Sequence, residues 1–245
     1  MGSSAPQPDL TSRVLRHERA LVAASLAGLA ALAWWYLAER AALASSTMSE
    51  PPFGALVVMW WLMMVAMMLP SAAPAVLLYS RVREMRNRDS AIAQTWVFLA
   101  GYLGVWLLFS IGAAIVQLLL VGPSMSLDNR FAQGAVLVVA GLYQLSPVKS
   151  ACVRECRSPA QFISRHWRSG TIGAVQLGVR HGLYCLGCCW MLMVLLFVGG
   201  VMNLLWVIAL TGIVAVEKLV PGGPQVGRLA GVALAAWGVV KLAGF

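Results

Sequence analysis

One histidine and three cysteines lie close together in an otherwise apolar stretch, HGLYCLGCC, which runs from His181 to Cys189. A helix advances about 100° per residue, so Cys185 and Cys188 fall roughly 40° and 20° to either side of His181 and share one face with it. Cys189 falls about 80° away and joins only from the edge of that face. Thiolate sulfur and imidazole nitrogen are ligands of Cu(I) and Zn(II), and neighbours three or four positions apart on a helix can converge on one ion. We therefore predict that these four residues bind a soft transition metal.

Packing is the alternative explanation, because free cysteine is a small hydrophobe that fits well into apolar interiors. That explanation would account for a single cysteine. Here three cysteines fall within five residues, one turn from a histidine that directly follows Arg180. Ionisable groups at membrane depth are costly and usually functional, so the pattern favours a binding site.

A second set of soft donors lies in the stretch MWWLMMVAMML, where Met59, Met63 and Met67 follow one another at i, i+4 spacing and Met64 and Met68 form another such pair. Thioethers are neutral ligands suited to Cu(I), and they avoid the desolvation cost of a charge. A stripe at helical spacing is also what any buried face shows, so packing remains open. We predict that Met63 and Met67 contribute to the same site.

A third cluster is the polar segment SPVKSACVRECRSP, in which Cys152 and Cys156 stand four residues apart. On a helical turn the two thiols would be neighbours, able to hold a metal or to close a disulfide after rearrangement. A structural disulfide is not expected in a reducing cytoplasm. We predict a metal donor or acceptor on the inner side, with a pair of inert thiols as the alternative.

The composition identifies the class of protein that positions these residues. Of 245 residues, 60% are hydrophobic and 11% charged, and the mean hydropathy is +0.79, which indicates an integral membrane protein. The net charge of +9 does not indicate nucleic-acid binding, because the basic residues are confined to short connectors between apolar stretches. The five cysteines show no disulfide framework.

The apolar stretches predict an all-α, polytopic bundle of about seven membrane-spanning helices. A span needs roughly 20 residues. The predicted spans are Ala20–Ala38, Phe53–Ser80, Ile92–Val121, Phe131–Ser146, Thr171–Val198, Val201–Val220 and Val226–Gly244. Pro70 and Pro74 predict a kink or break of the second span near Leu69.

The connectors predict the orientation of the bundle. With the N-terminus in the cytoplasm, the inner connectors hold fourteen Lys and Arg residues and the outer ones three, and Arg180 lies within a span. Short cytoplasmic loops carry this excess, so we predict a multi-pass protein of a bacterial inner membrane, with the lipid bilayer as its first partner. Residues 1–19 form a cytoplasmic tail, and residues 20–245 form a single transmembrane domain.

Four segments together resemble a known bacterial family: WWLMMVAMMLPSA, SPVKSACVRECRSP, HGLYCLGCCWMLM and GGVMNLLW followed by Glu217 and Lys218. The family is catalogued as predicted metal-binding integral membrane proteins, one of the numbered domains of unknown function. The resemblance covers roughly residues 51–220, and the pattern Gly-x-x-Cys-x-Gly-Cys-Cys-Trp at Gly182 to Trp190 is its most specific part. It implies a bound metal and supplies no substrate.

We predict a protein that binds copper, with zinc as the less favoured metal, for transfer across the membrane or delivery to a partner protein. A thiol–disulfide oxidoreductase using Cys185 and Cys188 is the enzymatic alternative, because C-x-x-C is the spacing of such enzymes. The predicted outer loops contain no cysteine that would serve as its exchange partner, so an enzyme is the less favoured class. A structural subunit or assembly factor of a larger membrane complex is the third alternative. No catalytic motif is present.

Overall fold

The computed structural model describes residues 10–43, 52–86, 91–121 and 126–244, and within these ranges the chain forms helices and no strand. The helices are α1 (Leu10–Leu43), α2 (Phe53–Arg86), α3 (Ala91–Val116), the π-helical extension η2 (Gln117–Val121), α4 (Arg130–Gln144), α5 (Pro147–Arg157), α6 (Pro159–His166), α7 (Gly170–Val194), α8 (Leu196–Gly199), α9 (Leu204–Leu219) and α10 (Gly223–Leu242). Residues 1–9 of the predicted tail lie outside the described residues, and residues 10–19 continue α1.

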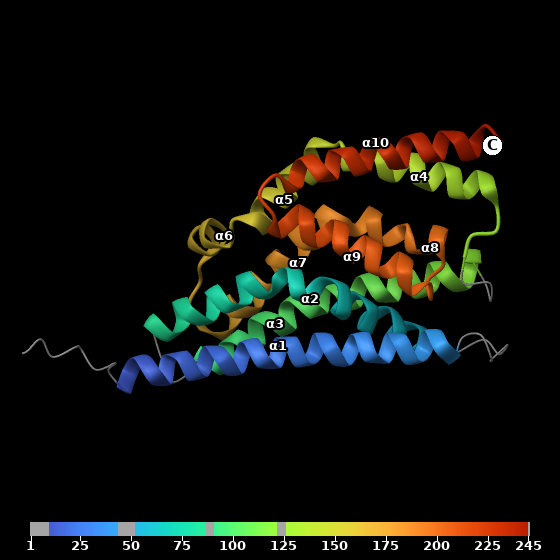
Figure 1. Cartoon of the computed structure of the whole chain (residues 1–245). Helices are drawn as coiled ribbons and strands as arrows, with labels where there is room; N and C mark the ends of the chain where they lie inside the picture. Colours follow the sequence, from blue (N-terminus) through green and yellow to red (C-terminus); the bar gives the residue numbers. More distant parts are fainter. Residues whose placement is uncertain (1–9, 44–51, 87–90, 122–125, 245) are drawn as a thin grey trace, which may run out of the picture.

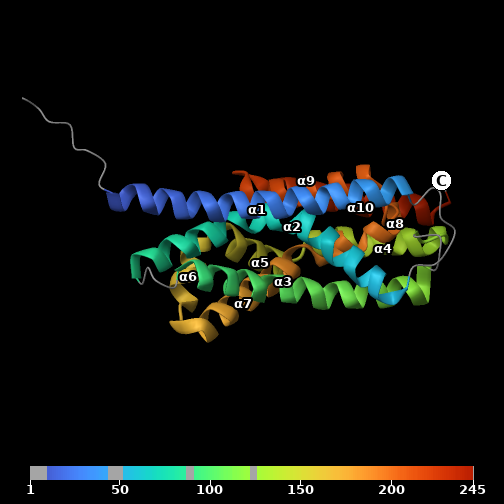
Figure 2. The ribbon, with the colours of Figure 1, turned by 90° about the horizontal axis from the view of Figure 1, so that it is seen from below.

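The long helices run side by side along one direction (Figures 1 and 2). α1 forms one edge and packs against α2, while α4 and α10 pack together at the opposite edge. Between these edges α3 packs against both α2 and α7, and α9 contacts α2 and α10. α7, which carries the cysteine motif, is therefore surrounded by other helices.

Four of the predicted spans are confirmed as helices long and apolar enough to cross a membrane: Ala20–Ala42, Phe53–Arg86, Ala91–Val121 and Gly170–Gly199. A fifth is added if α4 and α5, which are bent by 61°, count as one broken span. The last two predicted spans are helices, but α9 has only 16 residues, and α10, with Arg228 and Lys241 among its 20 residues, is not apolar enough to qualify. The described residues therefore give four or five spans by length and composition, fewer than the seven expected.

α2 continues through both prolines, contrary to the break considered near Leu69, and it changes direction near its middle (Figures 1 and 2). Because Pro70 has no N–H, the carbonyl of Ala66 loses its helical partner. The indole Nε1 of Trp34 donates to that oxygen at 3.1 Å. A neighbouring helix thus satisfies the freed carbonyl, as membrane helices with proline require.

The bend between α4 and α5 follows from the sequence Ser146-Pro147. The hydroxyl of Ser146 caps α5 by accepting from the backbone N–H of Lys149 at 3.2 Å, and Pro147 occupies the first turn, where its missing N–H costs nothing. Because α5 begins at Pro147, the chain changes direction before α4 is long enough to cross a membrane by itself. α5, with Cys152 and Cys156, is thereby directed against α7.

Glycines set the separation of α3 and α7. A Cβ on Gly178 would lie 2.0 Å from the backbone oxygen of Phe98, and a Cβ on Gly101 would lie 2.7 Å from the oxygen of Val175. Small residues let membrane helices approach closely, where van der Waals packing rather than water exclusion drives association. The close approach of α3 brings Tyr102 to the cysteine face of α7.

Gly178→Ala is expected to lower stability by about 1–3 kcal/mol, because the added methyl group meets backbone and forces α3 and α7 apart. Thermal unfolding of the purified protein in detergent measures this change. Gly104→Ala is the matched control, since a Cβ there has nothing within 4 Å. Equal melting temperatures for the two variants would contradict the packing described for α3 and α7.

Candidate metal centre

Four thiols from two helices gather on the buried face of α7. Cys185, Cys188 and Cys189 are each 1% exposed, and α5 contributes the partly buried Cys156. The thiol of Cys188 interacts electrostatically with those of Cys156, Cys185 and Cys189. We refer to these four residues as the thiol cluster, and Cys188 is its centre.

Gly187 allows α5 to approach the cluster. A Cβ on Gly187 would lie 2.8 Å from the sulfur of Cys152, so an added methyl group would displace that side chain. The carbonyl of Gly187 also accepts a hydrogen bond from the hydroxyl of Tyr143 on α4. The glycine between the cysteines therefore leaves room for the thiol of Cys152 on α5.

Cys185 has two polar neighbours from other helices. The ammonium group of Lys218 on α9 donates to the sulfur of Cys185 at 3.0 Å and to the hydroxyl of Ser71 at 3.3 Å. The hydroxyl of Tyr102 lies 3.1 Å from the same sulfur and 3.4 Å from the carbonyl oxygen of Met68. Lys218 is only 7% exposed, so its charge needs a negative partner, and the sulfur of Cys185 is in position to be one.

The other two α7 thiols are satisfied by the backbone. Cys188 and Cys189 donate to the carbonyl oxygen of Cys185 at 3.0 and 2.9 Å. The sulfur of Cys189 also lies 3.6 Å from the thioether sulfur of Met68 on α2. Across the described ranges no three His, Cys, Asp or Glu side chains are already grouped as a metal site. Cys188 and Cys189 thus lie close together, and the same backbone carbonyl oxygen accepts the protons of both thiols.

His181 lies on the same face of α7, as its spacing predicts, but among aromatic rings. Its ring centre is 5.2 Å from that of Phe162, 5.6 Å from Tyr102 and 6.1 Å from Phe98. The Nδ1 atom is buried and has no hydrogen-bond partner among the described residues. A buried imidazole nitrogen with an unused lone pair or proton stays available to a ligand, one turn from Cys185.

The structure places the remaining predicted ligands as follows. Met63 and Met67 are fully buried in α2, but the thioether beside the thiols is that of Met68, the other methionine pair of this stretch. Cys152 is partly buried, with its sulfur against Gly187. Met63, Met67 and Cys152 therefore stay predictions as ligands.

Residues that sequence reasoning did not place at the site are Lys218, Tyr102 and Ser71. Lys218 stands out as a lysine in the apolar segment TGIVAVEKLV, but a lysine near the end of a span is also typical of an interfacial anchor. Tyr102 and Ser71 lie on helices far from the motif in the chain and carry no distinguishing pattern. Only the packing of α2, α3 and α9 around α7 brings them to the site.

A buried ion pair fixes α5 to α9 beside the cluster. The ammonium group of Lys149 contacts both carboxylate oxygens of Glu217, at 2.8 and 2.6 Å, and the amide of Gln144 donates to the same carboxylate at 2.9 Å. Arg157 donates to the carbonyl oxygens of Glu217 and Val220. Because Lys218 follows Glu217 directly, this network also holds Lys218 in place.

The chain is similar to a known protein family. A family model described as "PpoB2: Copper chaperone" matches residues 57–241. That range includes Met68, all four residues of the thiol cluster and Lys218. No curated protein and no solved structure matches the chain.

Proposed function

We propose that this chain, which belongs to the PpoB2 copper chaperone family, binds Cu(I) through the thiol cluster and passes it on within or across the membrane. The observation that carries the proposal is the group of four thiols from two helices around Cys188, with the thioether of Met68 beside Cys189. Thiolate and thioether sulfur select Cu(I), and a carrier needs several such donors so that the ion can move by exchange of one ligand at a time.

The ligands in this proposal are Cys156, Cys185, Cys188 and Cys189, with Met68 as the thioether donor. Cu(I) displaces thiol protons, so Cys188 and Cys189 turn their sulfur atoms away from the carbonyl of Cys185 when the ion binds. Structural zinc sites are built from Cys and His in tetrahedral geometry, without thioethers. The thioether of Met68 beside Cys189 therefore favours copper over zinc.

The direction of entry follows from the predicted orientation. The start of α1, helix α6 and the turn from α9 to α10 lie at the same end of the molecule (Figure 1), and these are connectors that hold the excess of Lys and Arg. If that end faces the cytoplasm, Cys156 on α5 is the entry ligand and Cys188 receives the ion from it. Cys189 and Met68 then hold the ion further from the entry side, and a partner protein takes it from there.

Loading the purified protein with Cu(I) tests this function. We expect about one ion retained per chain after removal of free metal, because the cluster forms a single group of donors. Retention of Zn(II) in preference to Cu(I), or no retention of copper above that of a detergent blank, would contradict the proposal.

Lys218→Met is expected to weaken Cu(I) binding by about 10–100-fold, the usual effect of removing a group that supports metal ligands. Cu(I) held by two thiolates carries one negative charge, which the ammonium group of Lys218 neutralises where water is excluded. Competition with a coloured Cu(I) chelator measures the change in Kd.

Lys241→Met is the control for this variant, since Lys241 donates to Gln133 at the far end of α10. An unchanged Kd for Lys218→Met would show that the lysine does not support the bound ion. A similar loss in both variants would contradict a specific role as well.

A further inference from the structure

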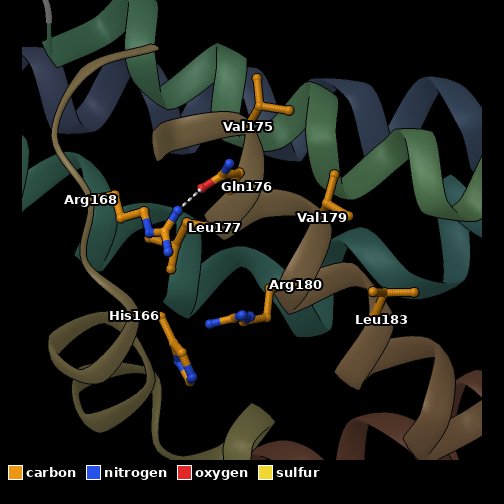
Figure 3. Close-up of a pocket in the computed structure, with 8 residues that line it drawn as sticks. All are labelled: His166, Arg168, Val175, Gln176, Leu177, Val179, Arg180 and Leu183. Atoms are coloured by element: carbon orange, nitrogen blue, oxygen red, sulfur yellow. Dashed lines mark hydrogen bonds between the residues drawn. The ribbon is translucent and has the colours of Figure 1, made fainter. Parts of the chain in front are cut away.

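A pocket of about 390 Å³ lies between the end of α6 and the first half of α7 (Figure 3), and no residue of the thiol cluster lines it. The residues that line it are His166, Arg168, Val175, Gln176, Leu177, Val179, Arg180 and Leu183. Every lining residue that can carry a charge is basic. The pocket is therefore suited to an anion.

The basic groups approach one another from two segments of the chain. Arg168, in the connector before α7, is held by a hydrogen bond of 3.0 Å to the amide oxygen of Gln176. Arg180 extends from α7 into the space between Arg168 and His166 (Figure 3). The Nδ1 of His166 lies 3.0 Å from the carbonyl oxygen of Phe162, which can only accept, so Nδ1 is the donor. The Nε2 of His166 can then donate to an anion when the ring is in its imidazolium form, which a bound anion favours.

The other wall of the pocket is apolar and follows the helix axis. Val175, Val179 and Leu183 recur at i, i+4 and i+8 of α7, and Val175 and Leu183 are 40% and 56% exposed. Residues at this spacing form one stripe of a helix. A positively charged group of side chains thus lies beside an exposed apolar stripe on a membrane helix.

We propose that this pocket binds an anionic phospholipid, with the phosphate between Arg168, Arg180 and His166 and an acyl chain along Val175, Val179 and Leu183. Guanidinium groups match phosphate in geometry and charge, and basic pockets between membrane helices on the cytoplasmic side recognise lipid headgroups. A free phosphate would use the same arginines but would leave the apolar stripe unused. This site is separate from copper binding and holds whether or not the proposed function does.

The test uses the purified full chain in neutral detergent, titrated with short-chain phosphatidylglycerol, phosphatidylcholine or glycerol phosphate. We expect phosphatidylglycerol to bind more tightly than either of the others. Arg168→Gln and Arg180→Gln are each expected to weaken that binding about fivefold, the effect of one arginine near an anionic headgroup. Arg154→Gln is the matched control, an exposed arginine on α5 outside this pocket.

Leu183→Ser keeps the charges and tests the apolar half of the site. This variant is expected to bind phosphatidylglycerol more weakly and to bind glycerol phosphate as the wild-type protein does. Equal binding of the two lipids, or an equal loss in Arg154→Gln, would reduce the effect to general charge attraction and overturn the proposal. Glycerol phosphate binding as tightly as phosphatidylglycerol would identify a free-anion site and overturn the lipid assignment.

Discussion

Cys188→Ser is expected to lower Cu(I) affinity by more than about 100-fold, the largest effect of any single cysteine. Removing a group that only supports a metal ligand costs up to about 100-fold, and Cys188 is proposed as a ligand itself. It is also the residue whose thiol interacts electrostatically with Cys156 on α5 as well as with Cys185 and Cys189 on α7. Serine oxygen is a hard donor that Cu(I) does not favour, so the variant divides the cluster into separate parts.

The measurement is a Cu(I) titration against a coloured chelator, with thermal unfolding as a check on the fold. Serine can donate to the carbonyl of Cys185 as the thiol does, so stability is expected to change little. Cys152→Ser is the matched control, because the sulfur of Cys152 packs against Gly187 and a smaller loss is expected there. A wild-type Kd in Cys188→Ser together with a large loss in Cys152→Ser would contradict the proposed ligand set.

Glu217→Gln is expected to destabilise the fold by about 3–5 kcal/mol, because it leaves the buried charge of Lys149 without a counter-ion. Lys149 and Glu217 are 3% and 2% exposed, and their side chains meet at 2.6 Å. Glutamine still accepts a hydrogen bond, but it does not carry the charge. Chemical unfolding in detergent measures the loss.

The double variant Lys149→Met with Glu217→Leu separates charge from packing. Replacing both members of a buried pair with apolar residues of similar size is often neutral, so the double variant is expected to regain most of the stability. A change within about 0.5 kcal/mol for Glu217→Gln alone, typical of surface substitutions, would contradict the buried pair. A double variant as unstable as Glu217→Gln would assign the effect to shape rather than to charge.

Sequence periodicity predicted the part of the site that lies on one helix. His181, Cys185 and Cys188 occupy one buried face of α7, as their three- and four-residue spacing requires. Cys189 was placed at the edge of that face, yet it is equally buried, because α2 covers that side of α7 with Met68. Angles within one helix cannot reveal how many neighbours surround it.

The contacts between helices were not predictable from the sequence. Glu217 pairs with Lys149 on α5, and Lys218 reaches Cys185, but neither pairing follows from the spacing of these residues in the sequence. The same limit applies to the number of spans. Hydropathy predicted that residues 131–146 cross the membrane by themselves, but α4 qualifies only if it is counted together with α5, into which the chain turns at Ser146. Pairings across more than 30 residues depend on which helix faces pack, and hydropathy alone does not specify them.

X-ray absorption at the copper edge of the Cu(I)-loaded protein tests the central claim most directly, because it identifies the atoms bound to the metal. We expect the copper ion to be surrounded mainly by sulfur atoms, and by fewer sulfur atoms in Cys188→Ser. A single nitrogen neighbour in the wild-type protein would assign His181 to the site as well. A first shell made only of nitrogen and oxygen, unchanged in Cys188→Ser, would contradict copper binding by the thiol cluster.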